Sequence, residues 1–325
     1  MGNLAAICSK LGEFRKAEAL EVIVLEKRRK LLGEDHPDTL NAMGNLAVTS
    51  SRLGEFEKAE ALQVLVREKC SKLLGEDHPD TLSAMSNLAQ TYSNLGEFQK
   101  AKKLKILVLD KRTKLLGEDH PDTLLAMGNL AATYSTLGEF QKGKELEVLV
   151  LDKHTKLLGE DHPRTFLAMG NLASTYHQLG ELQKAQELQV QALEKHTKLL
   201  GEDHPSTLST MGNLASTYHQ RGELQKAQEL GVQVVEKQTK LLGVDHPDTL
   251  RAMANLAVTY NILGDSNKAL GLEVEVLQKR RKLFGNKHPH TILAMQNLAM
   301  TYELLSKQEE MEELQQLIED TKKSL

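Results

Sequence analysis

Seven His-Pro pairs are the feature of this sequence whose residue type and spacing could support chemistry. They start at His36, His78, His120, His162, His204, His246 and His288, each 42 residues after the last. A histidine can ligate a metal ion or transfer a proton near neutral pH. Because a whole repeat separates each histidine from its copies, no second or third ligand lies nearby in the sequence. Since proline suits the first turn of a helix, we predict that these pairs begin helices.

Two further histidines, His177 and His219, occupy matching positions in two copies of Ser-Thr-Tyr-His-Gln. We expect them to stack on one face of adjacent helices, where they could contact an acidic partner or hold a metal ion. Because no carboxylate stands at matching positions, we interpret both as solvent-facing side chains. His154 and His196 are also expected at the surface.

Catalytic and phosphate-binding motifs are missing from the sequence. It contains no Gly-x-x-x-x-Gly-Lys-Ser/Thr loop, no Gly-x-Ser-x-Gly elbow and no His-Glu-x-x-His helix. We therefore predict that the chain is not an enzyme and that it has no catalytic residues, no cofactor and no metal ion.

Composition narrows the partners and the cellular compartment. The net charge is −4, aromatic residues make up 4% and tryptophan is absent, which favours neither nucleic-acid binding nor base stacking. No apolar run is long enough to span a membrane, so we expect no membrane contact. The only cysteines, Cys8 and Cys70, are too few for a disulfide framework, which indicates a reducing compartment and a cytoplasmic location.

A second repeated marker, Asn-Leu-Ala, shows that the whole chain is periodic. It begins at Asn3, Asn45, Asn87, Asn129, Asn171, Asn213, Asn255 and Asn297, again every 42 residues. A fixed period of this size is typical of a stacked array, in which each unit buries its apolar face only against its neighbours.

Each unit is predicted to hold two helices. After Pro79, apolar residues recur at spacings of three and four until Gly96, which favours a first helix, called A. A second apolar stripe through Ala101, Leu104, Val108 and Leu115 ends at Gly117 and predicts a longer helix, called B. Because few residues separate the helices, we expect an antiparallel pair.

These motifs resemble the tetratricopeptide repeat: Asn-Leu-Ala, a Tyr three residues later, Leu-Gly, and an Ala five residues past that Gly. The 42-residue unit is similar to the repeats of kinesin light chains and of nucleotide-binding NTPase sensors. The resemblance implies an all-α, right-handed α-solenoid of helix-turn-helix units, with the A helices lining a concave groove.

We expect residues 1–325 to form a single array of about eight units. The first unit, 1–42, is incomplete at its start, which suggests a fragment of a longer protein. Residues 295–325 are expected to hold the final A helix and a polar C-terminal capping helix.

The resemblance also places a set of variable polar positions in the groove. While the frame repeats almost unchanged, these positions differ between units, as expected of a surface that recognises a partner. The alternative is neutral variation at exposed sites. The candidates are Gln90, Asn94, Ser174, His177, Ser216, His219 and Arg251.

The repeated asparagines are the constant part of the same groove: Asn45, Asn87, Asn129, Asn171, Asn213 and Asn255. Asparagine costs about 0.5 kcal/mol relative to alanine inside a helix, so its repetition implies a use for the amide. One hypothesis is that the amides hold the backbone of an extended peptide. The other is a ladder of hydrogen bonds between adjacent A helices.

The sequence therefore predicts a scaffold that binds a protein or an extended peptide through this groove. It could be the ligand-sensing part of a larger protein. The alternative is a structural module that self-associates end to end through the incomplete N-terminal unit.

Overall fold

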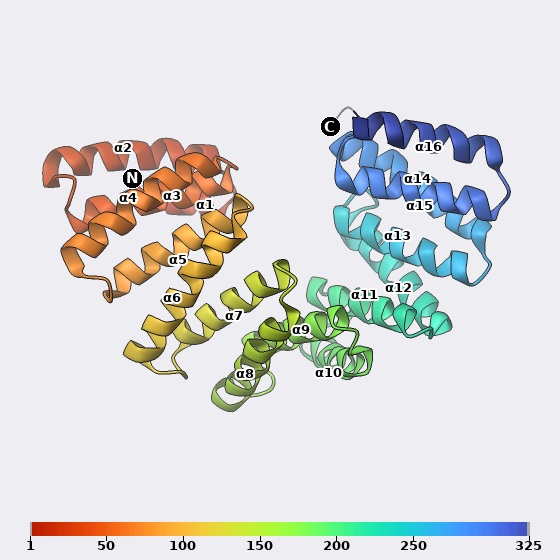
Figure 1. Ribbon diagram of the computed structural model, residues 1–325, viewed down its shortest axis with the longest axis horizontal. Helices are drawn as coiled ribbons and strands as arrows, with labels where there is room; N and C mark the ends of the chain where they lie inside the picture. Colours follow the sequence, from red (N-terminus) through yellow and green to blue (C-terminus); the bar gives the residue numbers. More distant parts are fainter. Residues whose placement is uncertain (1, 324–325) are drawn as a thin grey trace. The chain divides into compact units, whose positions relative to one another are not determined.

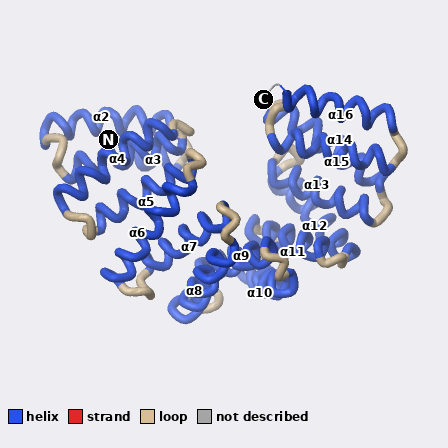
Figure 2. The backbone as a smooth tube through the Cα atoms, viewed as in Figure 1, coloured by secondary structure: helices blue, strands red, loops and turns tan. Residues whose placement is uncertain are grey.

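The computed structural model describes residues 2–323. These residues form sixteen helices joined by short loops, without any strand in that range (Figures 1 and 2). The chain divides into two compact units, Met1–Leu157 and Leu158–Leu325, which are considered separately below. Met1, Ser324 and Leu325, which the predicted array includes, lie outside the described residues.

The first unit contains four helix pairs, of which only the last residue of α8 belongs to the second unit. Their bounds are α1 (Gly2–Lys10), α2 (Phe14–Leu32), α3 (Pro37–Arg52), α4 (Phe56–Leu74), α5 (Pro79–Asn94), α6 (Phe98–Leu116), α7 (Pro121–Thr136) and α8 (Phe140–Leu158). Odd-numbered helices are the A helices and even-numbered helices the B helices.

The second unit contains the remaining four pairs. Their bounds are α9 (Pro163–Gln178), α10 (Leu182–Leu200), α11 (Pro205–Gln220), α12 (Leu224–Leu242), α13 (Pro247–Ile262), α14 (Ser266–Phe284), α15 (Pro289–Leu304) and α16 (Gln308–Lys323). Helix α16 lies where the polar capping helix was predicted, and it packs on α15 through Met311, Leu314 and Ile318.

The His-Pro pairs begin helices, as predicted. At His120 the ring Nδ1 accepts a hydrogen bond from the backbone N–H of Asp122 at 3.2 Å, and Pro121 is the first helical residue. The histidine is therefore the N-cap of the helix. Proline has no backbone N–H, so it leaves no unpaired donor at the first helical position. All seven pairs make the same contact.

Glycine ends the B helices at the same junction. Gly117 has φ +84°, a conformation that L side chains rarely adopt, and its N–H bonds the carbonyl of Thr113 at 3.0 Å. At the junction before α5, the Thr81 hydroxyl donates to the carbonyl of Gly75 at 2.8 Å. The junction is thus closed by hydrogen bonds from both helices.

An A helix inside a unit packs against the B helices before and after it in the chain: α5 contacts α4 and α6, and α13 contacts α12 and α14. The A-helix stripe of the sequence is confirmed at its centre, where Met85 and Ala89 are fully buried. The B-helix stripe is wrong at Leu115, which is 51% exposed because it lies in the last turn before the junction. Two faces of an A helix such as α5 or α13 are consequently covered, and its polar face is left exposed.

Candidate functional site

The repeated asparagines lie on the exposed face of the A helices. Asn45, Asn87, Asn129, Asn171, Asn213 and Asn255 are all exposed, while the Leu that follows each of them is buried. No side-chain amide of these six makes a hydrogen bond to another described residue. Among the described residues, no hydrogen bond therefore joins these asparagine side chains to one another, as the ladder hypothesis requires.

The variable groove candidates divide into bonded and open side chains. Asn94 accepts from Gln90 and donates to the hydroxyl of Ser51 on the preceding A helix, both at 3.1 Å. Arg251 bonds Asp248 of its own helix at 3.0 Å. Ser174 is exposed, so it is open to solvent.

Polar contacts between successive A helices run through a buried threonine. The Thr259 hydroxyl donates to the backbone carbonyl of Asn255 at 3.2 Å, and His219 Nδ1 lies 3.0 Å from the same oxygen. When the Thr259 hydroxyl donates to the Asn255 carbonyl, His219 bonds the same oxygen as the tautomer that carries its proton on Nδ1. In the next pair, Asn261 donates to Thr301 at 2.6 Å in the same way.

The interpretation of His177 and His219 as solvent-facing is therefore wrong. Both side chains are half-buried between repeats, and burial lowers the pKa of each; for His177 the backbone of Ser216 partly opposes the shift. The sequence pattern could not show this, because the covering residues belong to the next unit.

His196 is also buried rather than at the surface. It is 8% exposed, its ring meets the edge of Phe166 at 5.0 Å between centroids, and its Nδ1 lies 3.0 Å from the hydroxyl of Thr210. Burial and the nearby His204 lower its pKa. The B helix presents this residue to the following A helix, which explains the error.

A set of polar B-helix residues, which sequence reasoning missed, reaches the space between A helices. We call these the floor residues: Glu21, Gln63, Lys105, Glu147, Gln189, Gly231 and Glu273. Lys105 is half-buried and the other six are buried. The signal was present as a polar residue recurring every 42 residues beside an apolar stripe.

Floor residues contact the buried threonine of the following A helix. The Thr301 hydroxyl donates to the Glu273 carboxylate, and Lys105 Nζ donates to Thr133 Oγ1 at 2.7 Å. Burial raises the pKa of Glu273, and the hydrogen bond from Thr301 partly opposes this shift. Unlike the asparagines, Lys105 and Glu273 are therefore hydrogen-bonded to the neighbouring repeat.

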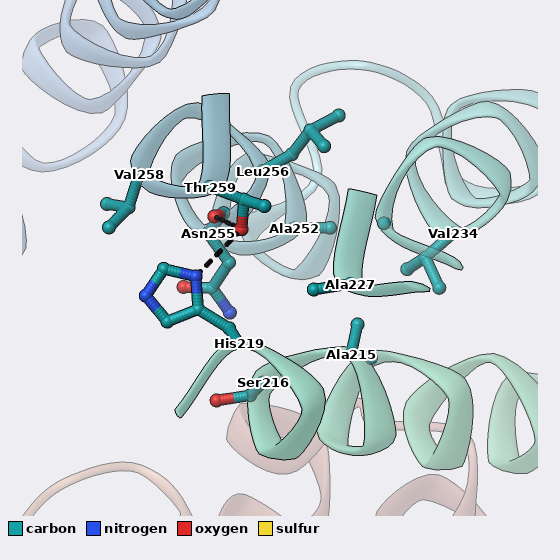
Figure 3. A pocket seen from close by; sticks show the side chains of 12 residues that line it. Ala215, Ser216, His219, Ala227, Val234, Ala252, Asn255, Leu256, Val258 and Thr259 are labelled. Carbon is teal, nitrogen blue, oxygen red and sulfur yellow. Dashed lines mark hydrogen bonds between the residues drawn. The ribbon is translucent and has the colours of Figure 1, made fainter. Parts of the chain in front are cut away.

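Gly231 leaves a cavity where the other floor residues have a side chain. The cavity is about 110 Å³ and lies between α11, α12 and α13. Figure 3 shows Val234, Leu256 and three alanines on one side, with His219, Ser216 and Asn255 on the other. It is therefore an apolar pocket with a polar edge.

Metal ligation and membrane crossing find no support in residues 2–323. No three His, Cys, Asp or Glu side chains within that range gather as metal ligands would. None of the sixteen described helices combines the length and apolar character that a membrane span requires.

Two family models described as tetratricopeptide repeat match most of the chain. One matches residues 1–64, 149–196 and 165–239, and the other matches 81–122, 123–164 and 249–290. The chain belongs to the tetratricopeptide repeat family. Both matching models describe repeats rather than enzymes. No curated protein sequence matches the chain.

Solved structures of other tetratricopeptide repeat proteins resemble this chain. A putative kinesin light chain of Podosopora anserina with nearly identical repeats is 32% identical, with a TM-score of 0.59, covering 64% of this chain and 98% of its own. The apo quorum sensor NprR of B. thuringiensis is 14% identical, with a TM-score of 0.72, covering 98% and 87%.

A third neighbour is the STAND protein PH0952 of Pyrococcus horikoshii, which has a tetratricopeptide repeat sensor. It is 17% identical, with a TM-score of 0.64, covering 98% of this chain and 51% of its own. The all-α repeat solenoid predicted from the sequence is thus confirmed.

Replacing Glu273 with Gln should stabilise the repeat array near neutral pH. Because the folded-state pKa of Glu273 lies above its ordinary value of 4.5, the contribution of this group to stability is fully present below that value and is lost as pH rises through the folded pKa. Glutamine stands at the equivalent positions 63 and 189, so it fits the site. Urea unfolding should show a gain on the order of 1 kcal/mol at pH 7.

The gain should shrink toward zero as pH falls below 4.5, because Glu273 is then neutral in both states. Glu275, which is less buried on the same helix, is the matched control for Glu→Gln. If Glu273→Gln and the parent chain were equally stable at every pH, burial of the Glu273 carboxylate would not destabilise the folded chain, and the prediction would be wrong.

Proposed function

We propose that the exposed faces of the A helices bind the backbone of an extended peptide. The observation that carries this proposal is the row of exposed asparagine amides, which lack a hydrogen bond to any described residue. An amide offers two donors and one acceptor, and can therefore pair with both the N–H and the C=O of one peptide residue.

The energetics also favour a ligand. Asparagine is a poorer helix former than alanine, and here no intramolecular hydrogen bond of its side chain offsets that cost. An exposed amide at the same position of six repeats is explained if it pairs with a repeating partner, and a peptide backbone is such a partner.

The similar structures support a sensing role for the array within this proposal. One neighbour is a quorum sensor and another carries a tetratricopeptide repeat sensor in a larger ATPase. We propose that this chain likewise detects a ligand for a larger protein. The buried, unpaired thiols of Cys8 and Cys70 support a reducing, cytoplasmic location.

Replacing Asn171, Asn213 and Asn255 with Ala should remove peptide binding while leaving the fold intact. The three residues lie in the second unit, on α9, α11 and α13. Loss of the hydrogen bonds between the amides and the peptide should weaken peptide binding by about tenfold per site. Alanine should also stabilise each helix by about 0.5 kcal/mol per site. Fluorescence anisotropy with a degenerate nine-residue peptide library and a thermal melt measure the two effects.

Asn267→Ala is the matched control, because Asn267 is exposed on the B helix α14, away from the A-helix face. A large drop in melting temperature with unchanged peptide binding would show instead that the asparagines stabilise the array.

The Gly231 cavity gives the proposed peptide a place for one small aliphatic side chain. The His219 ring already bonds the Thr259 hydroxyl, so the cavity does not need a polar occupant to satisfy that oxygen. Asn255 stands at its edge and could hold the backbone of the same peptide residue.

Filling the cavity by Gly231→Gln should stabilise the helix and weaken binding of peptides with Leu, Ile or Val at one position. Replacing a glycine inside a helix stabilises that helix by about 1 kcal/mol. The new Cβ would lie 3.1 Å from Leu256 Cδ1, and the Leu256 side chain can move to relieve this contact. Gly271→Gln is the control, because no atom lies within 4 Å of its Cβ position. Equal loss of binding in both variants would argue against the cavity.

A second candidate function, self-association, is favoured by an exposed apolar face formed by α1 and the turn residue that follows it. Leu4, Ile7 and Leu11 are 52%, 53% and 71% exposed. One repeat later, Leu46 matches Leu4 and is only 4% exposed, because α2 covers that face of α3. A second copy of the chain could cover α1 in the same way.

If self-association occurs here, the parent chain should be larger than 36.2 kDa by light scattering at micromolar concentration. Leu4→Glu with Leu11→Glu should then restore the monomer, because a buried carboxylate opposes the contact. The pair Leu199→Glu and Leu241→Glu introduces the same charges in the second unit and should have no effect. A parent mass of one chain at all concentrations would rule out this function.

A further inference from the structure

Lys105 is a floor residue whose charge has no acidic partner among the described residues. It lies on α6, and its Nζ donates to Thr133 Oγ1 at 2.7 Å and to Ser93 Oγ at 3.2 Å. Both hydroxyls donate their own hydrogens to backbone carbonyls, of Asn129 and Ala89. Neutral acceptors therefore satisfy two of the three N–H groups of Lys105, and its third N–H and its charge remain uncompensated.

The other repeats show that this cation is an exception. The equivalent floor residues are Glu, Gln or Gly, so lysine is not required for packing at this register. Burial without a counter-charge lowers the pKa of Lys105, which is the expected cost of removing an ammonium group from water. A structural role alone would be met by glutamine, as at positions 63 and 189.

Lys105 lines an open cleft between two A helices. The cleft has a volume of about 290 Å³ and is bounded by α5 and α7, with α6 beneath. Asn87, Gln90 and Asn129 lie on its walls, and Arg112 is a second cation in its lining. Arg112 donates to the backbone carbonyl of Asp122 at 3.1 Å, and no carboxylate is among the described lining residues.

We propose that this cleft binds the carboxylate of an Asp or Glu side chain in a peptide held by Asn87 and Asn129. This inference rests on the proposed function of the A-helix face and adds a side-chain preference to it. The occupant is indicated by charge complementarity, since two cations and two exposed amides surround a space without an acid. A carboxylate would accept the unused N–H of Lys105 in a charge-assisted hydrogen bond.

Positional-scanning libraries can test this preference with the full chain. Acetylated nine-residue peptides, degenerate except for one position fixed as Glu, Gln or Lys, serve as probes in fluorescence anisotropy. At one fixed position the parent chain should bind the Glu library about tenfold more tightly than the Gln library. Lys105→Gln should remove this difference, and Lys105→Glu should reverse it in favour of the Lys library.

Lys103→Gln is the matched control, because Lys103 is an exposed cation on the same helix and does not line the cleft. It should keep the Glu preference. A thermal melt should show that Lys105→Gln is folded, since glutamine occupies the same register in two other repeats.

Two results would overturn the Lys105 assignment alone: peptide binding without any Glu preference, or a Glu preference that Lys105→Gln retains. Displacement of the Glu library by millimolar inorganic phosphate, with no displacement of the Gln library, would assign the cleft to a free anion and would also overturn it. Absence of binding by every library would overturn this proposal together with the proposed function.

Discussion

The constraint on which this structure depends is that the described helices bury their apolar surface mainly against helices adjacent in the chain. The A helix α5, for example, is held between α4 and α6, so its residues Met85 and Ala89 are removed from water on two sides. What remains of each A helix is one polar strip, and the 42-residue period places the same asparagine on it every time. The candidate binding surface is thus what the packing leaves exposed.

A second level of organisation lies between the apolar core and that strip. Buried threonines accept hydrogen bonds from the preceding repeat, through His219 or Asn261, and they meet the floor residues from beneath. This layer can vary in chemistry because a threonine hydroxyl both accepts and donates: Thr133 accepts from Lys105 and donates to a backbone carbonyl, whereas Thr301 accepts from Asn261 and donates to the Glu273 carboxylate. Variation at the floor residues therefore changes the spaces between A helices without altering the apolar frame.

The sequence predicted the fold well because helix starts, stops and apolar stripes are local signals repeated in phase. The His-Pro starts, the glycine ends and the shortened first helix all follow from residues within one unit. The errors concern contacts between units. His177, His196 and His219 were assigned to the surface, yet the next repeat covers them, and no spacing within a single unit reveals that cover. The floor residues were missed for the same reason.

The uniform junctions also bear on how such a chain can change over generations. At all seven junctions a glycine ends one B helix and a capped His-Pro step begins the next A helix, so the joins are of one type. A gene that duplicates or deletes one whole unit would create no new type of join in the protein. Recombination alone could then change the order of repeats with different floor residues along the array. Arrays of any length would still have the same hydrogen bonds at their helix ends.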